Sequence, residues 1–161
     1  MKVLDKVWAC LRLALGWIFL WAFLDKVFGL GFSTAPDKAW LAGVSPTAGY
    51  LTAMTTGPFA SFYQSIAGNS VVDLLFMLGL LLLGVSLLLG IGVRVAGYSG
   101  ALLMFLMWTS ALPPQHNPFI DEHIVYIIVL VGLAYANTGM TWGLGKWWSR
   151  TNVAKRYPFL R

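Results

Sequence analysis

The sequence has one cysteine, Cys10, and only two histidines, His116 and His123. A single cysteine excludes an internal disulfide and a Cys-x-x-Cys redox pair. The histidines flank Pro118 on one short segment, so a haem held between histidines of facing helices is not expected. No glycine-rich phosphate loop follows a strand, and we find no flavin or nucleotide site. Any cofactor chemistry must therefore come from another kind of site.

Charge is also scarce, at 11% of residues, whereas hydrophobic residues make up 58% and the mean hydropathy is +0.74. This composition is typical of a membrane protein that crosses the bilayer several times. A bilayer-spanning helix needs about 20 apolar residues. Four segments meet this need, and in lipid they must be helical, because backbone groups find no other partners there. The segments are approximately 7–32, 71–92, 95–112 and 119–137.

The first apolar segment is preceded by Lys2 and Lys6, as in a signal peptide. It is too long for one and carries charges near its far end, so we expect a permanent helix. The segment Gly90-Ile91-Gly92-Val93-Arg94 leaves room only for a tight hairpin between the second and third helices. Small residues repeat along both helices, which allows backbones to approach closely. The sequence therefore predicts an all-α integral membrane protein, a compact four-helix transmembrane bundle in one domain (residues 1–161).

The long connection 33–70 is itself rich in apolar residues. Ser45-Pro46-Thr47 is typical of a helix start, with proline at the first helical position. Gly57-Pro58-Phe59 then interrupts the pattern, and 59–67 reads as a second short helix. Neither piece can span a bilayer. We expect an outer interfacial or re-entrant lid, with an ordered surface loop as the equal alternative.

The eleven Lys and Arg residues are distributed unevenly about the four segments. With the N-terminus inside, nine lie on the inner side, and only Lys26 and Lys38 lie outside. The positive-inside rule thus predicts a cytoplasmic-membrane protein with both termini in the cytoplasm. The basic tail 142–161 would face anionic lipid, so the net charge of +5 indicates membrane topology and not nucleic-acid binding.

Several charged residues lie at helix ends. Asp25 and Lys26 fall in the outer third of the first segment, where an ionisable residue is either a functional group or one that reaches the headgroups. Asp73 follows Ser70-Val71-Val72 in a capping-box arrangement, and we expect it to cap the second helix. Arg12 lies near the inner interface, so it should snorkel there as an anchor.

The fourth segment opens with Asn117 as an expected N-cap, followed by proline at the first helical position. Asp121 and Glu122 would then fall near the positive end of the helix dipole. His123 can change protonation near neutral pH, and Glu122 shares a helix face with Tyr126. A divalent metal on Asp121, Glu122 and His123 is conceivable but has no supporting spacing signature, so no metal site is predicted.

Short blocks spread over nearly the whole chain form a recognisable set. They are Leu11-Arg12-Leu13-Ala14-Leu15-Gly16-Trp17-Ile18-Phe19-Leu20 with Asp25-Lys26, Ser45-Pro46-Thr47-Ala48-Gly49, Gly57-Pro58-Phe59, Gly90-Ile91-Gly92-Val93-Arg94, Asn117-Pro118-Phe119-Ile120-Asp121-Glu122-His123 and Trp142-Gly143-Leu144-Gly145. Together they resemble the DoxX family of small membrane proteins. The resemblance implies four membrane helices. A related branch, DoxD, forms the membrane subunit of thiosulfate:quinone oxidoreductase, and other relatives are tied to redox-stress complexes or membrane-protein assembly, so fold is implied more firmly than function.

The leading hypothesis is a membrane subunit of a quinone-linked oxidoreductase, in which a quinone enters between helices. Four residues at the outer end would bind its carbonyls or exchange protons: Asp25, Lys26, Glu122 and His123. Four more would complete the binding site: Tyr126, Asp121, Asp73 and Asn117. The chain has no electron carrier of its own, so a redox partner subunit is expected, and a homo-oligomer is possible.

The alternative is a non-enzymatic assembly or scaffold protein, in which the same outer charges form a buried network and recognise a client. Transport ranks third, because the sequence lacks the paired broken helices of inverted-repeat transporters.

Overall fold

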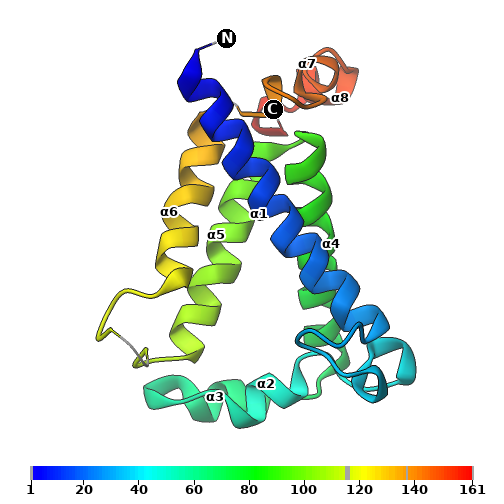
Figure 1. Cartoon of the computed structure of the whole chain (residues 1–161), viewed down its shortest axis with the longest axis vertical. Helices are drawn as coiled ribbons and strands as arrows, with labels where there is room; N and C mark the ends of the chain where they lie inside the picture. Colours follow the sequence, from blue (N-terminus) through cyan, green and yellow to red (C-terminus); the bar gives the residue numbers. More distant parts are fainter. Residues whose placement is uncertain (1, 115–116, 137, 161) are drawn as a thin grey trace.

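The computed structural model describes residues 2–114, 117–136 and 138–160, and every regular element within these ranges is helical. Its four long helices are α1 (Val3–Phe28), α4 (Ser70–Leu89), α5 (Val93–Ser110) and α6 (Glu122–Tyr135). The short helices are α2 (Ala48–Ala53), α3 (Ala60–Ser65), α7 (Gly145–Trp148) and α8 (Asn152–Arg156). The start of α1 lies at the same end of the long helices as α7 and α8 (Figure 1). We call this the termini end, and the opposite end, where α2 and α3 lie, the lid end.

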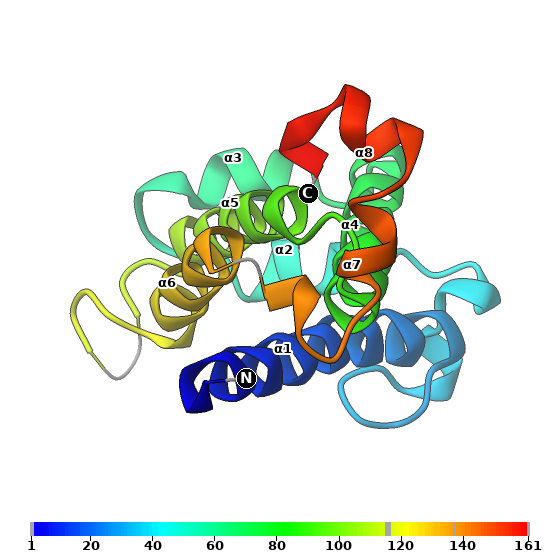
Figure 2. The same ribbon diagram turned by 90° about the horizontal axis from the view of Figure 1, so that it is seen from above.

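The long helices pack mainly in two pairs, α1 with α4 and α5 with α6 (Figure 2). Glycines make both contacts possible. A Cβ atom built on Gly84 would lie 2.7 Å from the backbone nitrogen of Leu20, and one on Gly97 would lie 2.6 Å from the carbonyl oxygen of Leu130. Such distances exclude a larger residue at either position. The prediction that small residues allow close helix contact is confirmed at these two sites.

Two of the helices are long and apolar enough to cross a membrane. They are α1, of 26 residues, and α4, of 20 residues, with mean hydropathies of 1.9 and 2.6 over their most apolar stretches. Only 28% and 33% of those stretches are buried within the protein. Much of the apolar surface, including Leu75 (65% exposed) and Leu82 (61% exposed), has no protein neighbour to cover it. This pattern indicates association with a membrane. The helix α6 is apolar but shorter, at 14 residues.

The helix ends differ from the predicted segments by a few residues. The first helix ends at Phe28 and not at residue 32, because Gly29 adopts a left-handed conformation (φ +63°) and closes the helix onto the carbonyl of Asp25. The second and third helices span 70–89 and 93–110 where the sequence predicted 71–92 and 95–112. The predicted end of the fourth segment, Asn137, lies outside the described residues, as does the last residue of the tail 142–161.

The N-terminus of α6 corrects a prediction. Asp121 is its N-cap, and its carboxylate accepts hydrogen bonds from the backbone of His123 and Ile124. The predicted cap, Asn117, instead accepts from the backbone of Phe119 and Ile120, closing a turn in the preceding loop. Both are good capping residues. Only the backbone path decides between them.

The helices α2 and α3 lie across the lid end of the long helices (Figure 1). The predicted pair of short lid helices is therefore confirmed, although α2 begins at Ala48, after the proline. Its first turn is fixed by Ser45, whose hydroxyl accepts a hydrogen bond from the backbone nitrogen of Ala48 (3.0 Å). Tyr63 is buried, whereas Met54 and Phe62 are exposed. One lid face packs on the bundle, and the other presents large apolar side chains outward.

Candidate functional site

An apolar groove of about 890 Å³ lies between α4 and α5. Its volume falls within the range of about 300–1,000 Å³ that is typical of small-molecule sites. The two helices join at the turn Gly90–Gly92 and diverge toward the lid end (Figure 1). Leucine side chains form much of the walls of the groove. The open centre includes Gly79, on which a built Cβ atom would meet nothing within 4 Å.

The two ends of the groove differ in chemistry. At the lid end it is bordered by a lysine and several hydroxyls: Lys26, Thr47, Tyr50, Tyr63 and Ser110. At the other end Trp148 and Leu160 of the C-terminal segment border it, and the indole nitrogen of Trp148 donates to the Leu160 carbonyl (2.6 Å). An amphiphile would fit with its polar head toward the lid.

Lys26, in the last turn of α1, is half-buried at the lid end of the groove. Within the described ranges its ammonium makes no hydrogen bond and no ion pair. Nearby, the hydroxyls of Tyr50 and Ser110 lie 3.0 Å apart. The groove therefore carries its positive charge and most of its hydroxyls at one end, while Ser86 and Ser99 lie further along its walls.

Asp25 adjoins Lys26 in sequence, but its carboxylate serves the turn after α1. It is only 1% exposed. It accepts hydrogen bonds from the backbone nitrogen of Phe32 (3.2 Å) and from the backbone nitrogen and hydroxyl of Ser33 (2.9 and 2.7 Å). These bonds hold the start of the connection against the end of α1.

Asp73 was predicted to cap α4, and that prediction is wrong. The cap is Asn69, whose side chain accepts from the first backbone N–H groups of the helix. Asp73 is 6% exposed, and its carboxylate accepts hydrogen bonds from the hydroxyls of Ser45 (2.8 Å) and Thr47. It ties the lid to α4. Because Thr47 also borders the groove, this contact positions one part of the groove wall.

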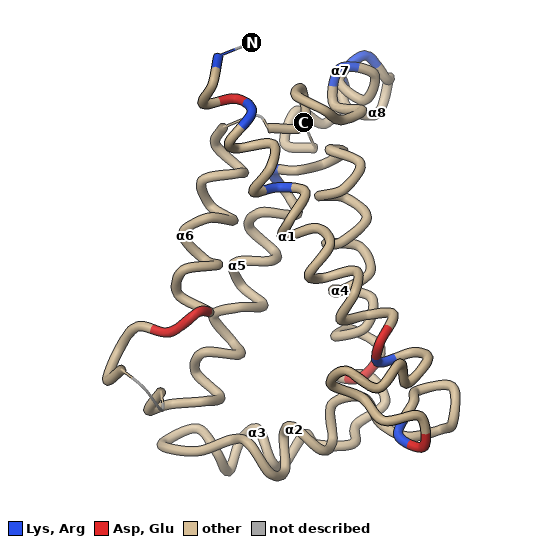
Figure 3. Tube along the Cα trace, in the orientation of Figure 1, with Lys and Arg blue, Asp and Glu red and all other residues tan. Residues whose placement is uncertain are grey.

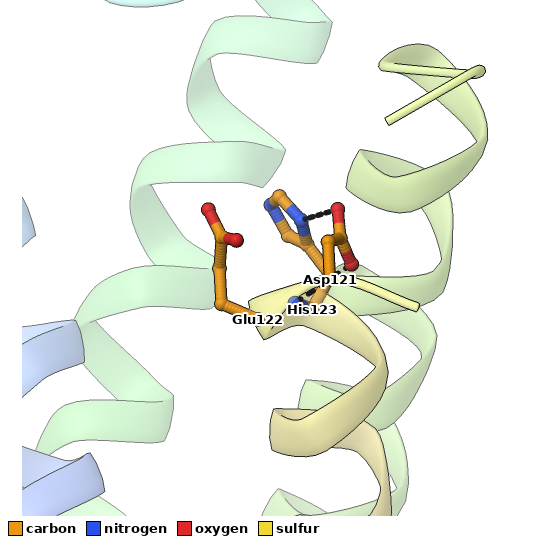
Figure 4. Close-up of side chains that lie close together, drawn as sticks. All are labelled: Asp121, Glu122 and His123. Carbon is orange, nitrogen blue, oxygen red and sulfur yellow. Dashed lines mark hydrogen bonds and ion pairs between the residues drawn. The ribbon is translucent and has the colours of Figure 1, made fainter. Parts of the chain in front are cut away.

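At the start of α6, Asp121 and His123 form a pair, with 2.8 Å between Asp121 Oδ2 and His123 Nδ1 (Figure 4). Glu122 lies to one side of this pair and is exposed. Ligand atoms of the three residues lie within 4.8 Å of one another, so they could hold a cation. Asp121 is already committed, however, as helix cap and histidine partner.

The charges at the start of α6 and at the end of α1 lie on different sides of the lid end (Figure 3). Among the described residues, no hydrogen bond or ion pair joins Lys26 to Glu122 or His123. The structure therefore does not bring together the four residues that the sequence grouped in one site. Of the eight predicted site residues, only Lys26 borders the groove. Tyr126 packs half-buried against the core, and Asn117 lies in an exposed loop.

Arg12 was expected to reach the membrane interface, but it is fully buried (0% exposed). Its guanidinium donates to the carbonyl oxygens of Leu87 and Leu88 near the end of α4. It also donates to those of Thr141 (3.1 Å) and Trp142 (2.9 Å) in the C-terminal segment. The last carbonyls of a helix lack partners within the helix and carry partial negative charge. Arg12 thus fastens the C-terminal segment to α4.

Glycines make room for this arginine. A Cβ atom built on Gly90 would lie 3.1 Å from Arg12 Nη1, and one on Gly143 would lie 3.2 Å from Nη2. One on Gly139 would lie 2.3 Å from the carbonyl oxygen of Gly90. The backbone itself is strained at Trp142, which takes φ +50°. The sequence signal for this site was a charge within an apolar segment, whereas the carbonyl groups that Arg12 meets cannot be recognised in the sequence.

No protein family, curated protein or solved structure matches the chain.

Proposed function

We propose that this chain is a multi-pass membrane protein of the DoxX type, with four spanning helices, which binds a quinone as the membrane subunit of a quinone-linked oxidoreductase. The observation that carries the proposal is the apolar groove between α4 and α5, whose one charged side chain and most of whose hydroxyls lie at the lid end. A lipid-borne quinone has the same division between an apolar tail and a polar ring. It would enter sideways between the two helices.

The chemistry of the groove supports this assignment. The ammonium of Lys26 would donate a hydrogen bond to a ring carbonyl, and the hydroxyl of Tyr50 lies at the same end. The Asp121–His123 pair remains a candidate for proton exchange at this end of the protein, although it does not border the groove. A partner subunit would supply the electrons.

The proposed topology keeps both termini in the cytoplasm and the lid outside. It rests on the uneven distribution of Lys and Arg and on the exposed apolar surface of α1 and α4. At 18 and 14 residues, α5 and α6 are shorter than a typical spanning helix, so the bilayer would be thinner around them. Impermeant thiol labelling tests this topology. Cys10 should be protected in intact cells, and a cysteine introduced at Asn117 should react.

Quinone binding can be tested by filling the groove. Gly79→Leu adds a side chain where a built Cβ atom meets nothing within 4 Å, so the fold should tolerate it. Gly49→Leu is the matched control, because Gly49 also has open space around it but does not border the groove. Titration of short-tailed ubiquinone and menaquinone analogues into protein in nanodiscs should show affinity lost in the first variant only. Equal affinity in wild type and both variants would rule out the groove as the site.

A scaffold role is the second candidate, and a specific observation favours it. Arg12, Asp25 and Asp73 all serve to hold segments of the chain together. The lid also presents Met54 (57% exposed) and Phe62 (60% exposed) outward, where a client could dock. Purification from native membranes separates the two functions. Bound quinone or a redox subunit supports the enzyme, and a membrane client without quinone supports the scaffold.

A further inference from the structure

We propose that the lid end of the groove selects a ligand with an anionic oxygen on an apolar tail, and that Lys26 recognises this oxygen. The inference rests on the proposed function only in taking the groove as the ligand site. It goes further by specifying the charge of the head. The lid end of the groove offers a ligand few free hydrogen-bond donors.

The hydroxyl of Ser110 is already used, because it donates to the carbonyl of Met107 (2.7 Å). In the contact of 3.0 Å between Tyr50 and Ser110, the proton therefore comes from Tyr50. Tyr50 is left with free lone pairs and no free proton. Toward a ligand it is an acceptor.

The hydroxyl protons of Tyr63 and Thr47 are also used in hydrogen bonds within the protein. Tyr63 lies within hydrogen-bond distance of the Leu106 carbonyl (3.0 Å) and the Thr109 hydroxyl (2.6 Å). Thr109 itself donates to Leu106, so the Tyr63 proton goes to one of these two acceptors. Thr47 donates to the carboxylate of Asp73. None of these groups has a proton to give to a ligand.

Lys26 is the exception. Its ammonium has three N–H donors, and within the described residues none meets an acceptor. The neighbouring acid, Asp25, points its carboxylate to the turn at Phe32 and Ser33, and Asp73 is held by the lid. A charge without a hydrogen-bonded counter-ion is costly next to apolar walls. A ligand oxygen with negative charge offsets that cost more than a neutral carbonyl does.

These donors and acceptors define a chemical class. The head should carry one anionic oxygen for Lys26, and a hydroxyl elsewhere on the head would find an acceptor in Tyr50. A singly ionised quinol has both groups, and an ionised hydroxyquinone has the anionic oxygen alone. A fatty acid shares the anionic oxygen and the apolar tail, and so it is the other source of the same chemistry.

A matched pair of naphthoquinones tests the inference directly. Both carry the same alkyl tail. One has a ring hydroxyl that is ionised at neutral pH, and the other has this hydroxyl as its methyl ether. Wild-type protein in nanodiscs should bind the anionic compound about tenfold more tightly, since a hydrogen bond to a charged group is worth more than one to a neutral group. Lys26→Met should abolish the difference, and Lys26→Arg should keep it. The control is Lys38→Met, a change at an exposed residue outside the groove.

The outcomes separate this inference from the proposed function. If both quinones bind wild type equally, the charge selection is wrong and quinone binding stands. If neither binds, but palmitate binds in a manner that requires Lys26, the anion site stands and the quinone function fails. If none of the three compounds binds, both are overturned. Should Lys26→Met fail to fold, the wild-type ratio and Lys26→Arg still decide.

Discussion

Two cations of α1, Arg12 in its first half and Lys26 in its last turn, are used in opposite ways. Arg12, at the termini end, is fully buried and donates to carbonyl oxygens from two separate parts of the chain. Lys26, at the lid end, is half-buried beside an apolar groove and meets no acceptor within the described ranges. Residue type alone does not explain this difference. The surroundings decide it.

The comparison suggests how to distinguish structural from functional charge in this protein. Arg12 donates from both Nη groups to backbone carbonyls, although its buried Nε meets no acceptor in the described residues, so it contributes to stability and has little left for a ligand. A cation that lacks acceptors lowers stability in the empty state and gains on ligand binding. Asp25 and Asp73 belong with Arg12, because both accept several hydrogen bonds from the connection between α1 and α4. Only Lys26 is free to act on a ligand among these four.

The largest expected effect is the loss of Arg12. Arg12→Met keeps apolar volume but leaves several buried carbonyl groups without donors, so the free energy of unfolding should fall by about 3 kcal/mol. Thermal unfolding in mild detergent measures this. Arg150→Met, at an exposed arginine, should change stability by less than about 0.5 kcal/mol. An equal loss of stability in the two variants would show that Arg12 contributes no more to folding than an exposed arginine does.

The next effect concerns the contact between α4 and the lid. Asp73→Ala leaves the hydroxyls of Ser45 and Thr47 without their acceptor and should cost about 2 kcal/mol. Hydrogen exchange should rise in residues 45–51, where the lid loses its attachment. Asp37→Ala, at an exposed acid in the same connection, serves as control. Unchanged exchange at the lid would show that other contacts hold it.

Lys26→Met should have a smaller effect, and on a different quantity. Removing an ammonium that lacks acceptors should leave the unfolding free energy unchanged or raise it by up to about 1 kcal/mol. Affinity for an anionic amphiphile should fall about tenfold. Thermal unfolding with and without ligand measures both quantities. A marked loss of stability would show that Lys26 is a structural residue like Arg12, and the contrast between the two cations would be wrong.

The smallest effect is expected at Glu122, which is exposed and does not border the groove. Glu122→Gln should alter stability by less than about 0.5 kcal/mol and leave ligand affinity unchanged. Asp121→Ala, one residue away, should cost about 1 kcal/mol because it removes the N-cap of α6. A loss of ligand binding in Glu122→Gln would return this residue to the site, as the sequence first suggested.

The apolar runs, and the glycine and proline residues that interrupt them, were sufficient to predict the helices. A long apolar stretch that lies in lipid must be helical. The observed helix ends fall within a few residues of the predicted ones, as at Gly29 and Gly90. The two short lid helices were also predictable, since Pro46 and Pro58 interrupt an otherwise helical pattern. Local sequence carries these features because each depends on residues within one or two turns.

The use of each charge was decided by tertiary structure alone. Sequence reasoning grouped Lys26 with Glu122 because both lie near the same end of their helices, but depth along a helix does not determine the side of the bundle on which a residue lies. Arg12 finds acceptors 75 and 130 positions away, and Tyr50 meets Ser110 across 60 residues. No periodic pattern records such pairs. Hydrogen-bonding partners that distant are chosen by helix packing, and so only the folded chain shows that Arg12 meets backbone acceptors whereas Lys26 meets none within the described residues.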